Sequence, residues 1–263
     1  MKTITILAAL LAAGSAHALE PFRVYDNFSS TPVNPALWTG GERVLTTKGG
    51  ALNLMQRSWG LATADSGLSF VNFNENVTDP AAVTALRAKI TVNALEVNAC
   101  PSSPAVGQSR ARIIGGFFNS GTPTPGSQLG DVIAQVRLTR LSNSADAAGV
   151  LRVQGLASLC TSADCNNASV IGNIVDLGTV NVGQATTVQM QWDQPAKSFL
   201  FARDNGAFSG SVAYTQSDAS PPGLAFKQLS TRLDLASCLS APRVPGSVDA
   251  SFDNIAVNKS AAP

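Results

Sequence analysis

The chain has 263 residues, of which 13% are charged, and it carries a formal net charge of +1 at pH 7. Its only histidine, His17, falls in an N-terminal segment that has the pattern of a secretory signal peptide. Cleavage of that segment would leave no histidine, which excludes Ser-His-Asp catalysis, His-ligated zinc and a histidine pH switch from the mature chain. The small net charge also predicts no nucleic-acid partner and no bulk attraction to an anionic membrane.

The first predicted element is the signal peptide itself, Met1–Ala18. Lys2 supplies a positive start, Ile4–Ala13 is a short apolar stretch, and Ala16-His17-Ala18 has the small residues of a cleavage site. After cleavage near Ala18 we expect a secreted or periplasmic protein with one domain, residues 19–263. No later apolar run reaches the roughly 20 residues that a membrane helix needs, so we expect no membrane insertion.

Apolar and polar residues alternate along much of the remaining chain. The pattern is most regular in four segments, 86–92, 132–139, 151–154 and 188–193. Alternation of this kind predicts strands with one face in a core and the other in water. Clusters of Gly, Pro, Asn and Ser separate such segments, and no convincing helical period is present. The expected fold class is therefore all-β, a two-sheet antiparallel β-sandwich.

Four cysteines follow the signal peptide, an even number that suits disulfides in an oxidising compartment. Cys160 and Cys165 are separated by only a short polar turn, which favours a local bridge between them. That choice leaves Cys100 to pair with Cys238, each of which ends a strand-like run before a proline-rich loop. We therefore predict the pairs Cys160–Cys165 and Cys100–Cys238.

Three stretches of the chain resemble the concanavalin A-like lectin/glucanase superfamily. They are the opening Tyr25-Asp-Asn-Phe-Ser29 with Asn34–Trp38, the hairpin-like Gln191–Asp193 with Ser198–Ala202, and the closing Val248–Val257. The resemblance implies a jelly-roll sandwich in which the closing strand pairs beside the first strand. It implies a fold and no particular activity, because that superfamily contains lectins, hydrolases, lyases and adhesion modules.

The catalytic patterns of the superfamily's enzymes are missing. The laminarinase type carries Glu-x-Asp-x-x-Glu on one strand, whereas the only glutamates after the signal peptide are the isolated Glu20, Glu42, Glu75 and Glu96. The alginate-lyase type uses Gln-x-His, which a chain without histidine cannot supply. We expect no catalytic residue to carry over. Asp193 and Asp234 sit on polar strand positions and could form a hydrolytic carboxylate pair, but ordinary solvated carboxylates are the expected outcome.

Arginine and glutamine recur on the polar sides of the predicted strands. Arg87, Arg112, Arg137, Arg152, Arg203 and Arg232 all occupy strand positions expected to point outward. If the strands share one sheet, guanidinium and amide groups would suit carboxylate-bearing or hydroxyl-rich glycans. The alternative is an ordinary solvated sheet face. The candidate ligand-binding residues are Arg87, Gln135, Arg137, Arg152, Gln154, Gln189, Gln191 and one aromatic ring, Trp59.

We expect no cofactor, and the one cation considered is a structural calcium ion shared by Asp26 and Asp253. The leading hypothesis for function is a secreted, non-catalytic module that binds glycan or cell-envelope material. Two alternatives remain open: an extracellular polysaccharide hydrolase or lyase with an unfamiliar carboxylate arrangement, and a purely structural or adhesion protein.

Overall fold

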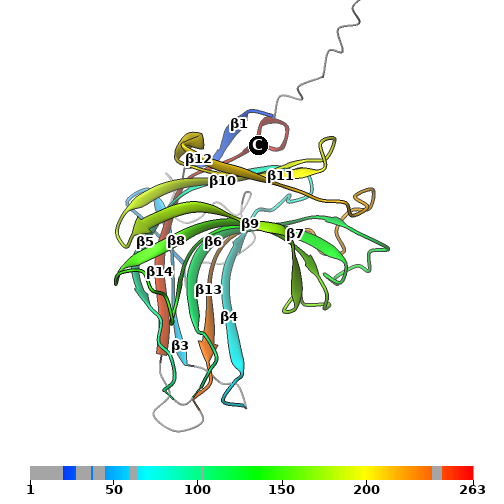
Figure 1. Ribbon diagram of the computed structural model, residues 1–263. Helices are drawn as coiled ribbons and strands as arrows, with labels where there is room; N and C mark the ends of the chain where they lie inside the picture. The colour runs from blue at the N-terminus through cyan, green and yellow to red at the C-terminus, as the bar shows by residue number, and fades with distance from the viewer. Residues whose placement is uncertain are drawn as a thin grey trace, which may run out of the picture.

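The computed structural model describes residues 20–27, 37, 45–59, 64–101, 103–238 and 245–262. The predicted signal peptide, Met1–Ala18, lies outside the described residues. The described strands form two antiparallel sheets packed face to face (Figure 1). This arrangement confirms the two-sheet sandwich predicted from the alternation pattern. No helix among the described residues is long and apolar enough to cross a membrane.

One sheet has eight strands, in the order β12-β11-β10-β5-β14-β3-β2, with β1 also paired to β14. The closing strand therefore lies beside the first, as the superfamily resemblance implies. The strands are β1 (Phe22–Asp26), β2 (Leu45–Lys48), β3 (Ala51–Trp59), β5 (Ala85–Glu96), β10 (Ala185–Asp193), β11 (Ser198–Arg203), β12 (Phe208–Ala213) and β14 (Pro245–Asn258).

The other sheet has six strands, in the order β4-β13-β6-β7-β8-β9, and its strands bend strongly (Figure 1). They are β4 (Leu68–Asn76), β6 (Gln108–Asn119), β7 (Asp131–Leu141), β8 (Val150–Cys160), β9 (Ala168–Asn181) and β13 (Lys227–Ala236). Two short 3-10 helices complete the described elements, η1 (Asp204–Gly206) and η2 (Lys259–Ala261). We call the side of this sheet that faces away from the core its outer face.

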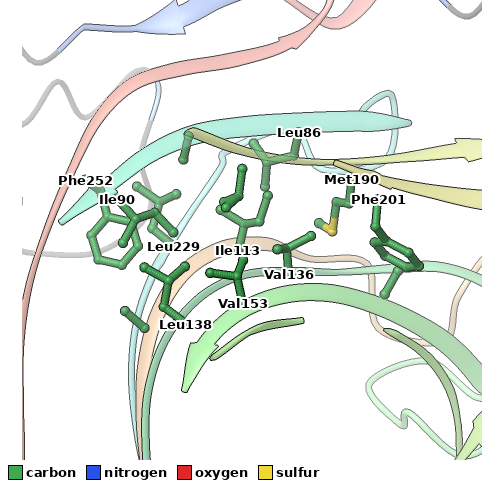
Figure 2. Close-up of a cluster of buried hydrophobic side chains, with 14 of the residues drawn as sticks. Leu86, Ile90, Ile113, Val136, Leu138, Val153, Met190, Phe201, Leu229 and Phe252 are labelled. Carbon is green, nitrogen blue, oxygen red and sulfur yellow. The ribbon is translucent and has the colours of Figure 1, made fainter. Parts of the chain in front are cut away.

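Apolar side chains from both sheets meet between them (Figure 2). Ile113 on β6 pairs with Val136 on β7, and Phe252 on β14 pairs with Ile90 on β5, all four being fully buried. Burial of such a side chain stabilises the fold by about 1.5–3 kcal/mol. Because the side chains of a strand alternate between its two faces, the same register places the intervening polar residues on the outer face.

Both predicted disulfides are present. Cys100–Cys238 joins the segment after β5 to the end of β13, and Cys160–Cys165 closes the turn after β8. The first bridge spans a sequence separation of 138 residues and the second spans 5. The two bridges constrain very different lengths of unfolded chain.

Gly115 and Gly116 sit where β6 passes close to Lys227 of β13. A Cβ atom on Gly115 would lie 2.2 Å from Cδ of Lys227, so only glycine fits there. The register of β6 against β7 shifts between Gly116 and Phe118, which is a bulge or irregularity in the strand. Lys227 is thereby buried, and its Nζ donates to the carbonyl oxygen of Gly116 at 2.6 Å.

Candidate functional site

The outer face of the six-stranded sheet carries a row of polar residues at matching strand positions. Arg112 of β6 lies opposite Ser230 of β13 on one side and opposite Arg137 of β7 on the other. Arg137 in turn lies opposite Gln154 of β8. A second pair, Arg110 of β6 opposite Arg232 of β13, lies two residues along the strands. We call Arg110, Arg112, Arg137 and Arg232 the arginine cluster.

Within the cluster, Arg112 is held by neutral acceptors. Its Nε donates to Oγ of Ser230 at 3.2 Å and its Nη1 to Oε1 of Gln135 at 3.1 Å. Its Nη2 donates to Oδ1 of Asn72 on β4 at 3.1 Å. Arg137 is held in a similar way, because its Nε and Nη2 both donate to Oε1 of Gln154. Each guanidinium is therefore oriented without a carboxylate beside it.

The other two arginines share one carboxylate, that of Asp234. Nη2 of Arg110 lies 2.7 Å from Oδ2 of Asp234, and Nε of Arg232 lies 2.6 Å from Oδ1. The guanidinium of Arg232 also lies over the ring of Phe70, 4.5 Å from its centroid. Phe70 is 41% exposed, which makes it a large aromatic ring open to solvent on this face.

The cluster is buried to a degree that is unusual for arginine. Arg110 and Arg112 are each only 6% exposed. Burial, opposed by Asp234 and reinforced by Arg232, lowers the pKa of Arg110 to about 9, which leaves it charged at neutral pH. Burial, reinforced by Arg110 and Arg232 and opposed by Asp234, lowers the pKa of Arg112 well below its usual value. The outer face thus concentrates positive charge away from bulk water.

A hollow of about 260 Å³ opens over three members of the arginine cluster, Arg110, Arg112 and Arg232. Its polar end is formed by arginine and amide side chains, and its other end by apolar side chains and the loop closed by the Cys160–Cys165 disulfide. The polar lining includes Asn72, Asn74, Arg110, Arg112, Arg232 and Gln228. The apolar lining includes Ile114, Ile133, Leu224 and Phe226. Two different chemistries therefore meet in one site.

Two carboxylates of the described residues lie in or beside the hollow, and both are engaged. Asp234 accepts from Arg110 and Arg232 with its two oxygens. Asp164, in the disulfide loop, accepts from the backbone N–H of Asn166 and from the hydroxyl of Ser162, which lowers the pKa of its carboxyl. A general acid must hold a proton at working pH, whereas the hydrogen bonds to Asp164 favour its ionised form.

With the geometry described, the chain can be compared with known proteins. No protein-family model matches it, and no curated protein sequence is significantly similar to it. A κ-carrageenase from Zobellia galactanivorans superposes with a TM-score of 0.50 at 8% identity, over 91% of this chain and 96% of the enzyme.

The chain has the concanavalin A-like jelly-roll fold.

Two further structures are more distant. A LamA variant from Z. galactanivorans in complex with laminaritriose and laminaritetraose gives a TM-score of 0.48 at 10% identity, over 92% of this chain and 100% of that one. The basic winged bean lectin with Tn-antigen gives 0.40 at 12% identity, over 91% and 99%. At such identities the likeness concerns the jelly roll alone.

The candidate ligand-binding residues identified from the sequence are divided between the two sheets. Gln135, Arg137, Arg152 and Gln154 lie on the outer face of the six-stranded sheet. Arg152 is at its margin, where Asp146 accepts from its Nε at 2.8 Å. The condition of a single shared sheet is not met for Arg87, Gln189 and Gln191, which lie on β5 and β10 of the eight-stranded sheet. The side chain of Trp59 lies outside the described residues.

Arg203 corrects a second expectation, because it points inward rather than outward. It follows Phe199 and Phe201 on the core side of β11, is 7% exposed, and donates from Nη1 to the carbonyl oxygen of Thr179 at 3.0 Å. Its guanidinium lies 3.9 Å from the centroid of the Phe208 ring. Arg203 therefore ties β11 of one sheet to β9, the edge strand of the other, and takes no part in the outer face.

The hypothetical carboxylate pair does not form. Asp193 ends β10 of the eight-stranded sheet and accepts from the backbone N–H of Ala196 at 3.0 Å, whereas Asp234 lies on β13 of the six-stranded sheet. The two carboxylates therefore serve separate local contacts.

At the suggested calcium site, Asp253 already contacts a cation of the protein, the ammonium of Lys89, at 2.5 Å. The described residues contain no group of three or more His, Cys, Asp or Glu side chains placed to hold a metal. Asp26 and Asp253 thus lack a third acidic ligand among those residues.

Sequence reasoning missed three residues of the site: Arg110, Asn72 and Phe70. Arg110 could have been found by extending the alternation of β6 two residues back from Arg112. Asn72 and Phe70 gave a weaker signal, because β4 alternates polar and apolar residues without indicating which sheet it joins. Their position beside β13 is a product of topology.

Proposed function

We propose that this protein is a non-catalytic module that binds polysaccharide on the outer face of its six-stranded sheet. The observation that carries the proposal is the hollow lined by Arg112, Arg232, Asn72 and Asn74, with the exposed ring of Phe70 close by. Guanidinium and amide groups form directional hydrogen bonds with sugar hydroxyls and acidic substituents, and an aromatic ring stacks on the apolar face of a pyranose.

The fold is consistent with this proposal. It is shared with a protein named for its action on carrageenan, yet a shared fold does not transfer an activity. The support therefore comes from the side chains. A hydrolase would need a protonated carboxyl group facing a second carboxylate, whereas contacts favour the charged form of Asp164, and both oxygens of Asp234 contact arginines.

Export from the cytoplasm belongs to the same proposal. Two disulfides are typical of a protein that folds in an oxidising compartment. The predicted signal peptide, Met1–Ala18, would deliver the chain there, where polysaccharides of the envelope or surroundings are accessible.

The test is binding of the exported protein to a panel of neutral and acidic polysaccharides, with parallel assays for new reducing ends and unsaturated products. We expect saturable binding to at least one polysaccharide and no turnover. Binding should be lost in Gln228→Trp, which fills the hollow without changing charge. Gln189→Trp, on the opposite sheet, is the matched control. Turnover of any polysaccharide, or equal binding by both variants, would overturn the proposal.

A further inference from the structure

The charges of the outer face do not balance. Four guanidiniums make up the arginine cluster, and the one carboxylate within ion-pair distance of any of them, among the described residues, is that of Asp234. Arg112 and Arg137 lie directly opposite each other with only neutral acceptors. Like charges opposite each other on one face of a sheet are destabilising. Stability of the fold alone does not explain this arrangement.

Burial increases that cost. Removing a charge from water is unfavourable unless an opposite charge and hydrogen bonds compensate for it. Arg112 has the hydrogen bonds but no carboxylate in ion-pair contact. Its lowered pKa reflects this burial and the repulsion from Arg110 and Arg232, which the more distant charge of Asp234 opposes without reversing. Electrostatic strain of this kind is concentrated at functional sites, where a ligand supplies the missing charge.

The arginine cluster also contains a buried N–H group without a hydrogen-bond acceptor. The Nε–H of Arg110 is buried and has no hydrogen-bond partner among the described residues. Buried donors are almost always satisfied in folded proteins, so an unsatisfied one needs an explanation. Arg110 lines the hollow together with Arg112 and Arg232. The unsatisfied donor and the uncompensated charge therefore belong to one site.

The contacts of Asp234 show how arginines of this cluster bind a carboxylate. Asp234 places its two oxygens 2.7 Å from Arg110 and 2.6 Å from Arg232, both at charge-assisted distances. Arg112, two residues along β6 from Arg110, has the same planar donor group and no such partner. An oxygen-rich anion of similar size in the hollow would give Arg112 what Asp234 gives its neighbours.

We infer that the hollow binds an anionic substituent of the polysaccharide, a sulfate ester or a uronate carboxylate, with Arg112 as its main ligand. Arg110 and Arg232 flank it, and Asn72 orients the guanidinium of Arg112. The apolar end of the hollow, at Ile114, Ile133 and Phe226, would contact the carbon skeleton of the adjoining sugar. This inference rests on the proposed function and names the class of polysaccharide.

The test compares three polymers with one backbone: dextran, carboxymethyl dextran and dextran sulfate. At equal ionic strength we expect one or both charged polymers to bind and dextran to bind at least about tenfold more weakly. The charged polymer that binds more tightly identifies the preferred oxyanion. Equal binding of all three would overturn the inference.

The variant that tests the site is Arg112→Gln, with Arg87→Gln as the matched control. Both substitutions remove one positive charge, but Arg87 lies on the eight-stranded sheet. We expect Arg112→Gln to weaken binding of the charged polymer about tenfold and Arg87→Gln to leave it within about twofold. Equal effects of the two variants would show that only bulk charge matters and would refute the site.

A small anion, inorganic sulfate, tests the same site without a polymer. Inorganic sulfate should raise the melting temperature of the wild type and of Arg87→Gln above that in chloride at equal ionic strength, because a ligand of the folded state stabilises it. Arg112→Gln should show a smaller rise, because only the general stabilising effect of sulfate on folded proteins remains. If Arg112→Gln fails to fold, Arg232→Gln replaces it with the same expected loss. No difference between the two salts in the wild type would contradict the inference.

The inference and the proposed function fail in different ways. Suppose that Gln228→Trp abolishes binding of a neutral polysaccharide while Arg112→Gln leaves all binding intact. The hollow then binds polysaccharide as proposed, but the inference that Arg112 binds an anionic substituent is wrong. If neither variant changes binding of any polymer, both are wrong.

Discussion

Arg112 on β6 lies directly opposite Arg137 on β7, and no described carboxylate forms an ion pair with either. Two residues along β6, Arg110 reaches Asp234 at 2.7 Å. Arg110 is therefore paired with a carboxylate, whereas Arg112 on the same strand has only neutral hydrogen-bond acceptors. This contrast allows us to predict which of these side chains stabilise the fold and which of them bind polysaccharide on the outer face.

The first prediction concerns Asp234. Asp234→Asn leaves Arg110 and Arg232 buried without their shared carboxylate, and removing one member of a buried ion pair costs about 3–5 kcal/mol. Arg137→Gln removes a charge that forms no ion pair and lies opposite Arg112, so we expect its free energy of unfolding to stay within about 1 kcal/mol of the wild type. Urea denaturation measures both. A larger loss for Arg137→Gln than for Asp234→Asn would contradict the assignment of roles.

The second prediction compares two arginines that the sequence treated alike. Arg137 lies beside Arg112, whereas Arg152 is paired with Asp146 at the margin of the face. We expect Arg137→Ala to weaken binding of an acidic polysaccharide several-fold more than Arg152→Ala, with nearly unchanged melting temperatures for both variants. Added salt should weaken wild-type binding, since exposed charges are screened over about 8 Å at physiological ionic strength. Binding that is insensitive to salt and to both substitutions would exclude an acidic ligand.

The extent to which the sequence predicted this site follows from what alternation encodes. A period of two determines which residues of a strand share a face, so Arg137, Gln135 and Gln154 were correctly separated from the core. It contains no information on which sheet a strand joins. Arg87 and Gln189 follow the same pattern as Arg137, yet their strands lie in the other sheet, and β10 is reached from β9 through a turn of only three residues, 182–184.

Arg203 shows the limit of the pattern at the end of a strand. A position on the core side of a strand is usually apolar, but at the end of β11 an arginine can bury its stem and still reach the carbonyl oxygen of Thr179 and the ring of Phe208. The disulfides were easier to predict, because four cysteines allow only three pairings and one of those contains a short local bridge.

The third prediction concerns the two disulfides, which differ in the length of chain that they close. In the chain-entropy model the Cys100–Cys238 bridge contributes about 5 kcal/mol and the Cys160–Cys165 bridge about 2 kcal/mol. We expect Cys100→Ala/Cys238→Ala to be far less stable than Cys160→Ala/Cys165→Ala in urea denaturation.

The short bridge has a second consequence, because Cys165 and Asp164 line the hollow. Cys160→Ala/Cys165→Ala should therefore weaken polysaccharide binding while the fold persists, as judged by circular dichroism. Wild-type affinity in that variant would show that the loop takes no part in the site.

The last prediction uses Lys227, which is buried beside the ring of Phe117 with its Nζ 4.3 Å from the ring centroid. Burial lowers the pKa of this amine to about 7. In the unfolded chain the same group holds its proton up to about pH 10.4. Between these values the unfolded state binds more protons than the folded state, so the free energy of unfolding rises with pH.

We therefore expect the wild type to become more stable from pH 7 to pH 9 in urea denaturation. The slope should be shallower in Lys227→Met, because the group that releases a proton on folding is gone. Lys89→Met is the matched control, since Lys89 is only partly buried and lies on the other sheet, and it should keep the wild-type slope. Parallel slopes in all three proteins would mean that Lys227 keeps its proton in the folded state, held by the carbonyl oxygens of Gly116 and Pro80.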